Sequence, residues 1–126
     1  MGGRNHDRSS HSPAFRLFHA AILKRQQVTL TYNGQYREVC PYILGHKNGK
    51  ETVLVFQFGG GSAERGPVRG EWRCFHLSDV ELPQARDGAW YGDAAHRTAQ
   101  SCVDDVYIDV NTDVPNQPGR RFRIVE

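Results

Sequence analysis

The first hydrophobic pattern along the chain has the spacing of a helix. Apolar side chains recur every three or four residues, at Phe15, Leu17, Phe18, Ala21 and Ile22. Ser12 followed by Pro13 is typical of a helix N-terminus, because serine caps free N–H groups and proline fits the first turn. The pattern predicts a short amphipathic helix over roughly residues 14–25, with Lys24 and Arg25 at the negative end of its dipole.

Over residues 28–32 the hydrophobic period changes to two, which is the period of a strand with one buried face. The dipeptide Asn33-Gly34 then predicts a tight hairpin turn, followed by a return strand over 36–42. Pro41 lies in that return strand, and since proline has no N–H to donate, we expect it at an edge, a bulge or the strand's end.

The middle of the chain continues with a second turn, a buried strand and a glycine-rich stretch. Asn48-Gly49 predicts the turn. Residues 51–58 are apolar on both faces, which indicates a central, buried strand. Residues 59–70 begin with three glycines and a serine, and this composition predicts a mobile surface loop without regular structure.

Two more strands are expected in the second half, one over 72–77 and a last one over 102–110. Between them, Pro83 and Gly88 argue against any long element. One helix followed by about five short strands predicts a mainly β, α+β fold. We expect a small SH3-like or Sm-like antiparallel β-barrel with an N-terminal helix, because closure removes exposed strand edges. The alternative is an open meander with the helix on one face.

Composition bounds the domain organisation. The chain has 126 residues, of which 38% are hydrophobic and 24% charged, and this balance fits one soluble domain. We expect a disordered arm over 1–12, a barrel domain over 13–111 and a basic tail over 112–126. The polar N-terminus has no signal-peptide core and no apolar run is long enough to cross a bilayer, so the expected location is cytoplasmic.

The cysteines and charges add two expectations. Cys40, Cys74 and Cys102 are an odd number spread widely through the chain, which predicts reduced thiols rather than a disulfide framework. The net charge is only +2, but the first 50 residues carry eight Lys or Arg against two Asp or Glu. Thirteen of the 16 basic residues are Arg, which binds phosphate in a planar, bidentate manner, although genome composition also produces such a bias.

Three stretches of the chain resemble the WYL domain over about residues 20–80. They are Thr31-Tyr32, the run Arg37-Glu38-Val39-Cys40-Pro41-Tyr42, and Arg73-Cys74-Phe75-His76-Leu77. The family's Trp-Tyr-Leu signature falls near Thr52-Val53-Leu54, where only the leucine matches. The resemblance implies an Sm-like barrel that senses ligands or binds nucleic acid, commonly fused to a helix-turn-helix in bacterial transcription regulators. A single helix before the barrel is too little for such a DNA reader, so we expect a stand-alone relative.

Arg73 is the sharpest candidate for chemistry. Strand alternation places it on the face of Phe75 and Leu77, where a guanidinium must meet an acidic side chain, reach solvent at the rim, or line a pocket that receives an anion. The resemblance favours the pocket, with Arg37 as a neighbour and phosphate as the guest. Nearby aromatic residues offer stacking faces for bases or serve as core residues: Tyr32, Tyr42 and Trp72.

Other sites have less support in the sequence. Cys74 and His76 share a strand face and Cys40 lies nearby, but no fourth ligand stands at a recognised spacing for zinc. No nucleophile and base come with an orienting group, so we expect no enzyme, no metal and no cofactor. The prediction is a regulatory, ligand-sensing module that binds single-stranded nucleic acid or a nucleotide. The alternative is a barrel for self-association or partner binding without a small ligand.

Overall fold

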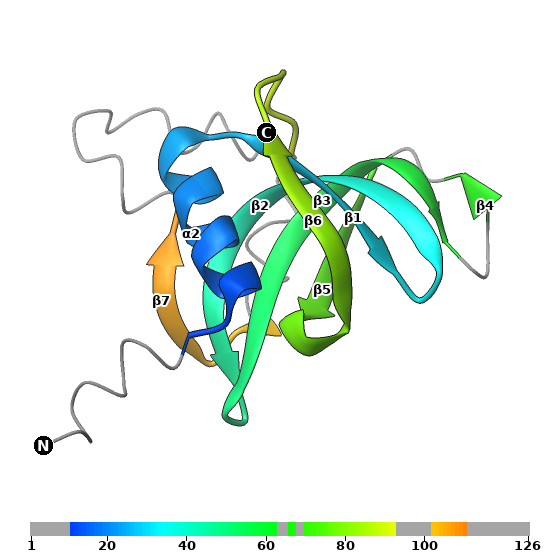
Figure 1. Ribbon diagram of the computed structural model, residues 1–126. Helices are drawn as coiled ribbons and strands as arrows, with labels where there is room; N and C mark the ends of the chain where they lie inside the picture. The colour runs from blue at the N-terminus through cyan, green and yellow to red at the C-terminus, as the bar shows by residue number, and fades with distance from the viewer. Residues whose placement is uncertain (1–10, 63–65, 68–69, 93–101, 111–126) are drawn as a thin grey trace, which may run out of the picture.

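The computed structural model describes residues 11–62, 66–67, 70–92 and 102–110 (Figure 1). The elements are helix α2 (Pro13–Lys24), strands β1 (Gln27–Tyr32), β2 (Gln35–Lys47), β3 (Lys50–Ser62), β4 (Gly66–Pro67) and β5 (Glu71–His76), the 3-10 helix η1 (Leu77–Asp79), and strands β6 (Val80–Arg86) and β7 (Asp105–Asp109). The predicted mainly β, α+β class is confirmed. Of the predicted disordered arm over 1–12, residues 1–10 lie outside the described residues, but Ser12 is ordered as the N-cap of α2, which corrects the bound of the arm. The predicted tail over 112–126 lies outside the described residues.

The strands pair in an antiparallel sheet with the order β6-β1-β2-β3-β5. Two strands pair with the same edge of the long strand β2: β1 pairs with its first part and β7 pairs with its last part. The short β4 pairs with the end of β3. Among the described strands no ladder joins β5 to β6, so closure of the barrel stays a prediction.

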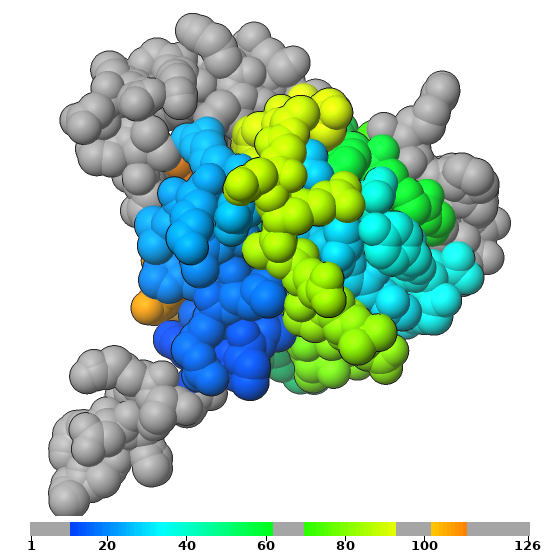
Figure 2. All heavy atoms as spheres, turned by 45° about the horizontal axis from the view of Figure 1, so that its top comes forward, coloured from blue at the N-terminus to red at the C-terminus, as the bar shows by residue number. Residues whose placement is uncertain are grey.

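Helix α2 forms where the sequence predicted it. The Ser12 hydroxyl accepts a hydrogen bond from the N–H of Phe15 at 3.1 Å, Pro13 occupies the first turn, and Arg25 ends the helix in the left-handed conformation. The apolar face buries Phe15, Phe18, Ala21 and Ile22 against the sheet. Figure 2 shows α2 lying beside β6 on the surface, so one side of the helix covers the strands and the other faces solvent.

Both predicted Asn-Gly turns are confirmed. Asn33 and Asn48 have φ near 53°, and the glycines that follow have φ of 76° and 82°, which is the conformation that a tight hairpin turn requires. Pro41 also lies where the sequence allowed it, at a register shift between β2 and β3. β2 is longer than the predicted return strand, because it continues through 43–47 to pair with β7.

The glycine-rich stretch corrects the sequence analysis. Residues 59–62, predicted as a loop, belong to β3, and Gly60 pairs opposite Arg37. Gly60 has φ of 87°, and a Cβ there would overlap the carbonyl oxygen of Tyr36. The glycines therefore do not end strand β3. They let it pass close to the backbone of β2 at a bulge.

Pro83 does not prevent a strand either. β6 spans Pro83 and pairs with β1, and the ladder absorbs the proline by a register shift between Thr29 and Thr31. Leu82 lies in this irregular part and has φ of 52°, an uncommon conformation for a branched side chain. The sequence analysis expected no long element here, and the strand that forms has seven residues and contains Pro83, because a bulge accommodates the missing N–H.

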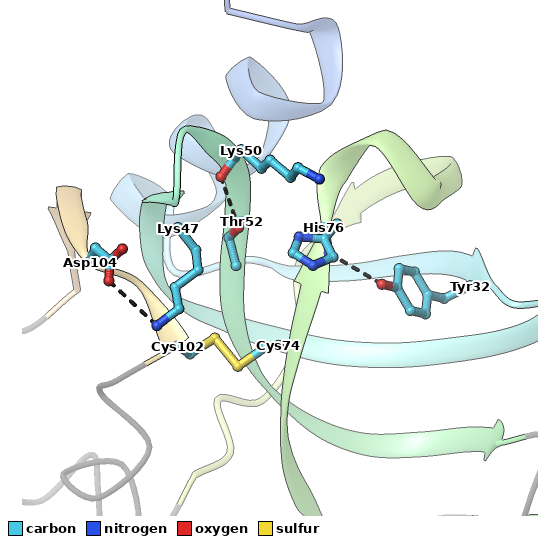
Figure 3. Close-up of a disulfide and its surroundings, with 8 residues drawn as sticks. All are labelled: Tyr32, Lys47, Lys50, Thr52, Cys74, His76, Cys102 and Asp104. Carbon is cyan, nitrogen blue, oxygen red and sulfur yellow. Dashed lines mark hydrogen bonds and ion pairs between the residues drawn. A yellow bond between two sulfur atoms is a disulfide. The ribbon is translucent and has the colours of Figure 1, made fainter.

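The expectation of reduced thiols is also corrected. Cys74 and Cys102 form a disulfide across 28 residues, with Cα atoms 6.0 Å apart, while Cys40 is free and buried. The two bonded residues come together because β5 and the segment before β7 both lie beside the middle of the sheet (Figure 3). In the described part of the chain, no helix is long and apolar enough to span a membrane.

Candidate functional site

A cleft of about 300 Å³ lies between the β1–β2 hairpin and β5. We call it the arginine cleft; its lining consists of Tyr32, Asn33, Arg37, Trp72, Arg73, Cys74 and Phe75. The lining contains two guanidinium groups and no carboxylate. A concave surface with this charge favours an anion as its guest.

Arg37 forms the β2 side of the cleft and is almost completely buried, with 3% of its surface exposed. Its Nη2 donates to the carbonyl oxygen of Tyr32 at 3.1 Å, and its Nη1 donates to Oε1 of Gln57 at 3.3 Å. Its Cζ lies 5.5 Å from the ring centroids of both Tyr32 and Phe75, which adds cation–π attraction. Arg37 therefore ties the hairpin to β3 and β5.

Arg73 forms the β5 side and is placed differently. Its side chain is 23% exposed, and its Nη2 makes an ion pair with Oε1 of Glu71 at 2.6 Å. Its Nε is buried and has no hydrogen-bond partner in the described structure. Two of the three outcomes expected for this residue thus occur together, because Arg73 meets an acidic neighbour and also lines a cleft.

The aromatic residues of the cleft hold its walls. The rings of Tyr32 and Phe75 stack with centroids 4.2 Å apart, and the hydroxyl of Tyr32 accepts a hydrogen bond from the backbone N–H of His76 at 3.2 Å. Trp72 is half-buried and meets Phe56 edge to face at 5.0 Å. The predicted residues Tyr32, Trp72, Arg37 and Arg73 are therefore brought together.

Tyr42 is not brought to the cleft, although the sequence analysis named it as a ligand-binding residue. Its ring is fully buried and meets Trp72 edge to face at 4.8 Å, and its hydroxyl donates to the carbonyl oxygen of Tyr91 at 2.7 Å. A ring in this position has no free face for a base. Tyr42 is a core residue, because β2 is buried on both faces from Val39 to Gly45.

Sequence reasoning missed two residues that shape the cleft. Asn33 lines it from the hairpin turn, and the Asn-Gly signal placed that residue without assigning it a role. Gln57 is fully buried, accepts from Arg37, and donates through Nε2 to the carbonyl oxygens of Gly59 and Gly61 at 3.0 and 3.1 Å. A polar residue at the end of an apolar strand was the available signal for this role.

The residues considered for zinc do not form a site. Cys74 is bonded to Cys102, and the described residues hold no group of three potential metal ligands. Cys40 lies apart, where its sulfur accepts from the N–H of Tyr91 at 3.3 Å. Burial raises the pKa of the Cys40 thiol to about 11, although the Tyr91 N–H and the charge of Arg86 act against it. The thiol is therefore neutral at physiological pH.

The chain was compared with known protein families, curated proteins and solved structures. No protein-family model, no curated protein and no solved structure matches the chain. The resemblance to the WYL domain thus depends only on the residues that carry it.

Proposed function

We propose that this protein is a non-enzymatic, ligand-sensing module of the WYL kind that binds a phosphate-bearing ligand in the arginine cleft. The observation that carries the proposal is the partly exposed guanidinium of Arg73, a residue that lines the same cleft as Arg37. Phosphate oxygens accept charge-assisted hydrogen bonds from such a group. Arg37 contributes a second positive charge while it holds the wall in place.

The size of the cleft favours one nucleotide unit of a longer chain. Pockets that enclose whole ligands of drug size measure roughly 300–1,000 Å³, and this cleft is at the bottom of that range. A phosphate with part of its sugar or base fills it, and the rest of the ligand extends over the surface. Half-buried Trp72 and exposed Asn33 line the same cleft, where the indole ring can stack on a base and the amide can form hydrogen bonds with it. Single-stranded nucleic acid is therefore the favoured ligand, with a free nucleotide as the smaller version.

Fluorescence polarisation tests the proposal. A labelled oligothymidylate and a labelled nucleotide are titrated with the full chain at two salt concentrations. We expect saturable binding that weakens as salt rises, because phosphate contacts release counterions. Arg73→Ala should lower the affinity about tenfold or more, which is the loss of one charge-assisted hydrogen bond.

Arg16→Ala is the matched control for that titration. Arg16 is an exposed residue of α2 outside the cleft, where it donates to the backbone of His11, so the two variants lose the same charge. We expect Arg16→Ala to bind within about twofold of the parent, since a distant surface charge is screened by salt. Equal loss in both variants, or no loss in Arg73→Ala, would contradict the proposal.

A second candidate function has its own observation. Leu82 is 79% exposed and Tyr36 is 52% exposed, and both line a hollow of about 200 Å³ on the outer face of β1 and β6. β6 runs across the face seen in Figure 2. Exposed apolar groups around a hollow are typical of protein contact surfaces. Light scattering distinguishes this candidate, because self-association gives a mass that rises with protein concentration and falls in Leu82→Ser.

A further inference from the structure

The Cys74–Cys102 disulfide has one open end and one shielded end. Cys74 is exposed on β5, whereas only 9% of Cys102 is exposed. Figure 3 shows the bond beside the sheet, with Lys47, Lys50 and His76 among the residues around it. This difference in residue exposure favours attack by a small nucleophile from solvent at Cys74 rather than at Cys102.

Both ends are also held in place without the disulfide. On the β5 side, Cys74 stands opposite Leu54 in the ladder with β3, next to the fully buried Phe75. On the other side, the N–H of Asp104 donates to the carbonyl oxygen of His46 at 2.9 Å, and its carboxylate pairs with Lys47 at 3.5 Å. None of these contacts involves a sulfur atom of the disulfide.

The segment after Cys102 has an anchor of its own. Val103, Ile108 and Val110 are buried, and the N–H of Val110 donates to the carbonyl oxygen of Tyr42 at 2.8 Å. β7 pairs with β2 along four positions. The disulfide can therefore open while the fold persists, which distinguishes it from a disulfide that substitutes for a small core.

We propose that Cys74 is a site of reversible S-thiolation by a small-molecule thiol. The thiolate of the small molecule attacks the sulfur of Cys74 and forms a new sulfur–sulfur bond there. The Cys74–Cys102 bond breaks, and its electron pair leaves on the sulfur of Cys102, which takes a proton from water. No external oxidant is needed, because one disulfide replaces another. In the reverse step the thiolate of Cys102 attacks Cys74 and expels the small thiol.

The inference concerns the disulfide alone and does not depend on what the arginine cleft binds.

Mass spectrometry with reduced glutathione as the probe tests the inference. The full chain is first oxidised with glutathione disulfide, then incubated with reduced glutathione, quenched with acid and mapped by peptide. We expect one adduct per chain, on Cys74, with the buried Cys40 unmodified and the circular dichroism unchanged. Removal of free glutathione should restore the Cys74–Cys102 bond.

Two variants keep the result decisive. Cys102→Ser should form the adduct on Cys74 from glutathione disulfide and should keep it after the free thiol is removed, since the resolving sulfur is gone. Cys74→Ser should form no adduct on Cys102. An adduct mapped to Cys102 in the parent, an adduct that forms only with loss of the folded spectrum, or failure of the oxidised chain to form the disulfide would overturn the inference.

Discussion

The two sides of the arginine cleft carry the same residue type in opposite situations. Arg37 on β2 is buried and donates to Gln57 and to the backbone of Tyr32, so its charge is used to hold the fold. Arg73 on β5 is partly exposed and meets its near neighbour Glu71 in an ion pair. The difference teaches that burial and hydrogen-bond partners, rather than residue type, separate a structural arginine from one that can recruit a ligand.

The largest effect that tests this difference between the two arginines is expected from the removal of Arg37, the structural arginine. Arg37→Ala leaves the buried acceptors on Gln57 and Tyr32 without their donor, so we expect a loss of about 3 kcal/mol in the free energy of unfolding. Chemical denaturation measures it. Arg73→Ala in the same experiment should lose less, about 1 kcal/mol, because its ion pair is only partly buried and both side chains reach solvent. Similar losses in both variants would mean that the two sides are not different.

A pH series extends the comparison to Cys40, a second buried polar group of β2. The fold raises the pKa of this thiol from 9.0 to about 11, so the folded chain keeps a proton that the unfolded chain releases. Its contribution to stability is complete below pH 9 and is lost as pH rises towards 11, by about 2 kcal/mol. Cys40→Ala removes the contribution of this thiol to the pH dependence of the free energy of unfolding. The difference between the pH profiles of the parent and the variant measures that contribution. Parallel profiles would show that the thiol is not shielded.

The smallest expected effect sharpens the role of Glu71. Glu71→Gln removes the carboxylate that competes with a ligand for Arg73, and we expect the affinity for labelled oligothymidylate to rise about threefold, the contribution of a partly exposed ion pair. Glu81→Gln on β6 changes the net charge equally and serves as the control, with an affinity close to that of the parent. Weaker binding in Glu71→Gln would show that the carboxylate orients Arg73 for its ligand.

Local signals in the sequence predicted much of this fold. Ser12 and Pro13 mark the start of α2, and the Asn-Gly turns fix two hairpins, because each signal acts through its own few residues. Strand β6 was not predicted, since Pro83 argues against a long element and only the pairing with β1 supplies the bulge that accommodates the proline. The glycines of β3 were misread because their partner, the backbone near Tyr36, is distant in sequence.

The candidate site was predictable in part for the same reason. Alternation along β5 placed Arg73 on the inner face, and the hairpin brought Arg37 and Tyr32 near it. The Glu71 partner lies two residues from Arg73 on the same face, but alternation alone does not choose between an ion pair and a cleft. The burial of Tyr42 and the Cys74–Cys102 bond depend on contacts between distant strands, which no local pattern contains.

The central claim is that the guanidinium of Arg73 is available to an anion, and NMR observes that group directly. In a ¹⁵N-labelled sample, the Nε–H resonances of the arginine side chains are followed while thymidine monophosphate is added. We predict that the Arg73 resonance shifts in a saturable manner, while that of Arg86, whose Nε already donates to Gln27 at 2.8 Å, stays in place. An unchanged Arg73 resonance at saturating nucleotide would contradict the account.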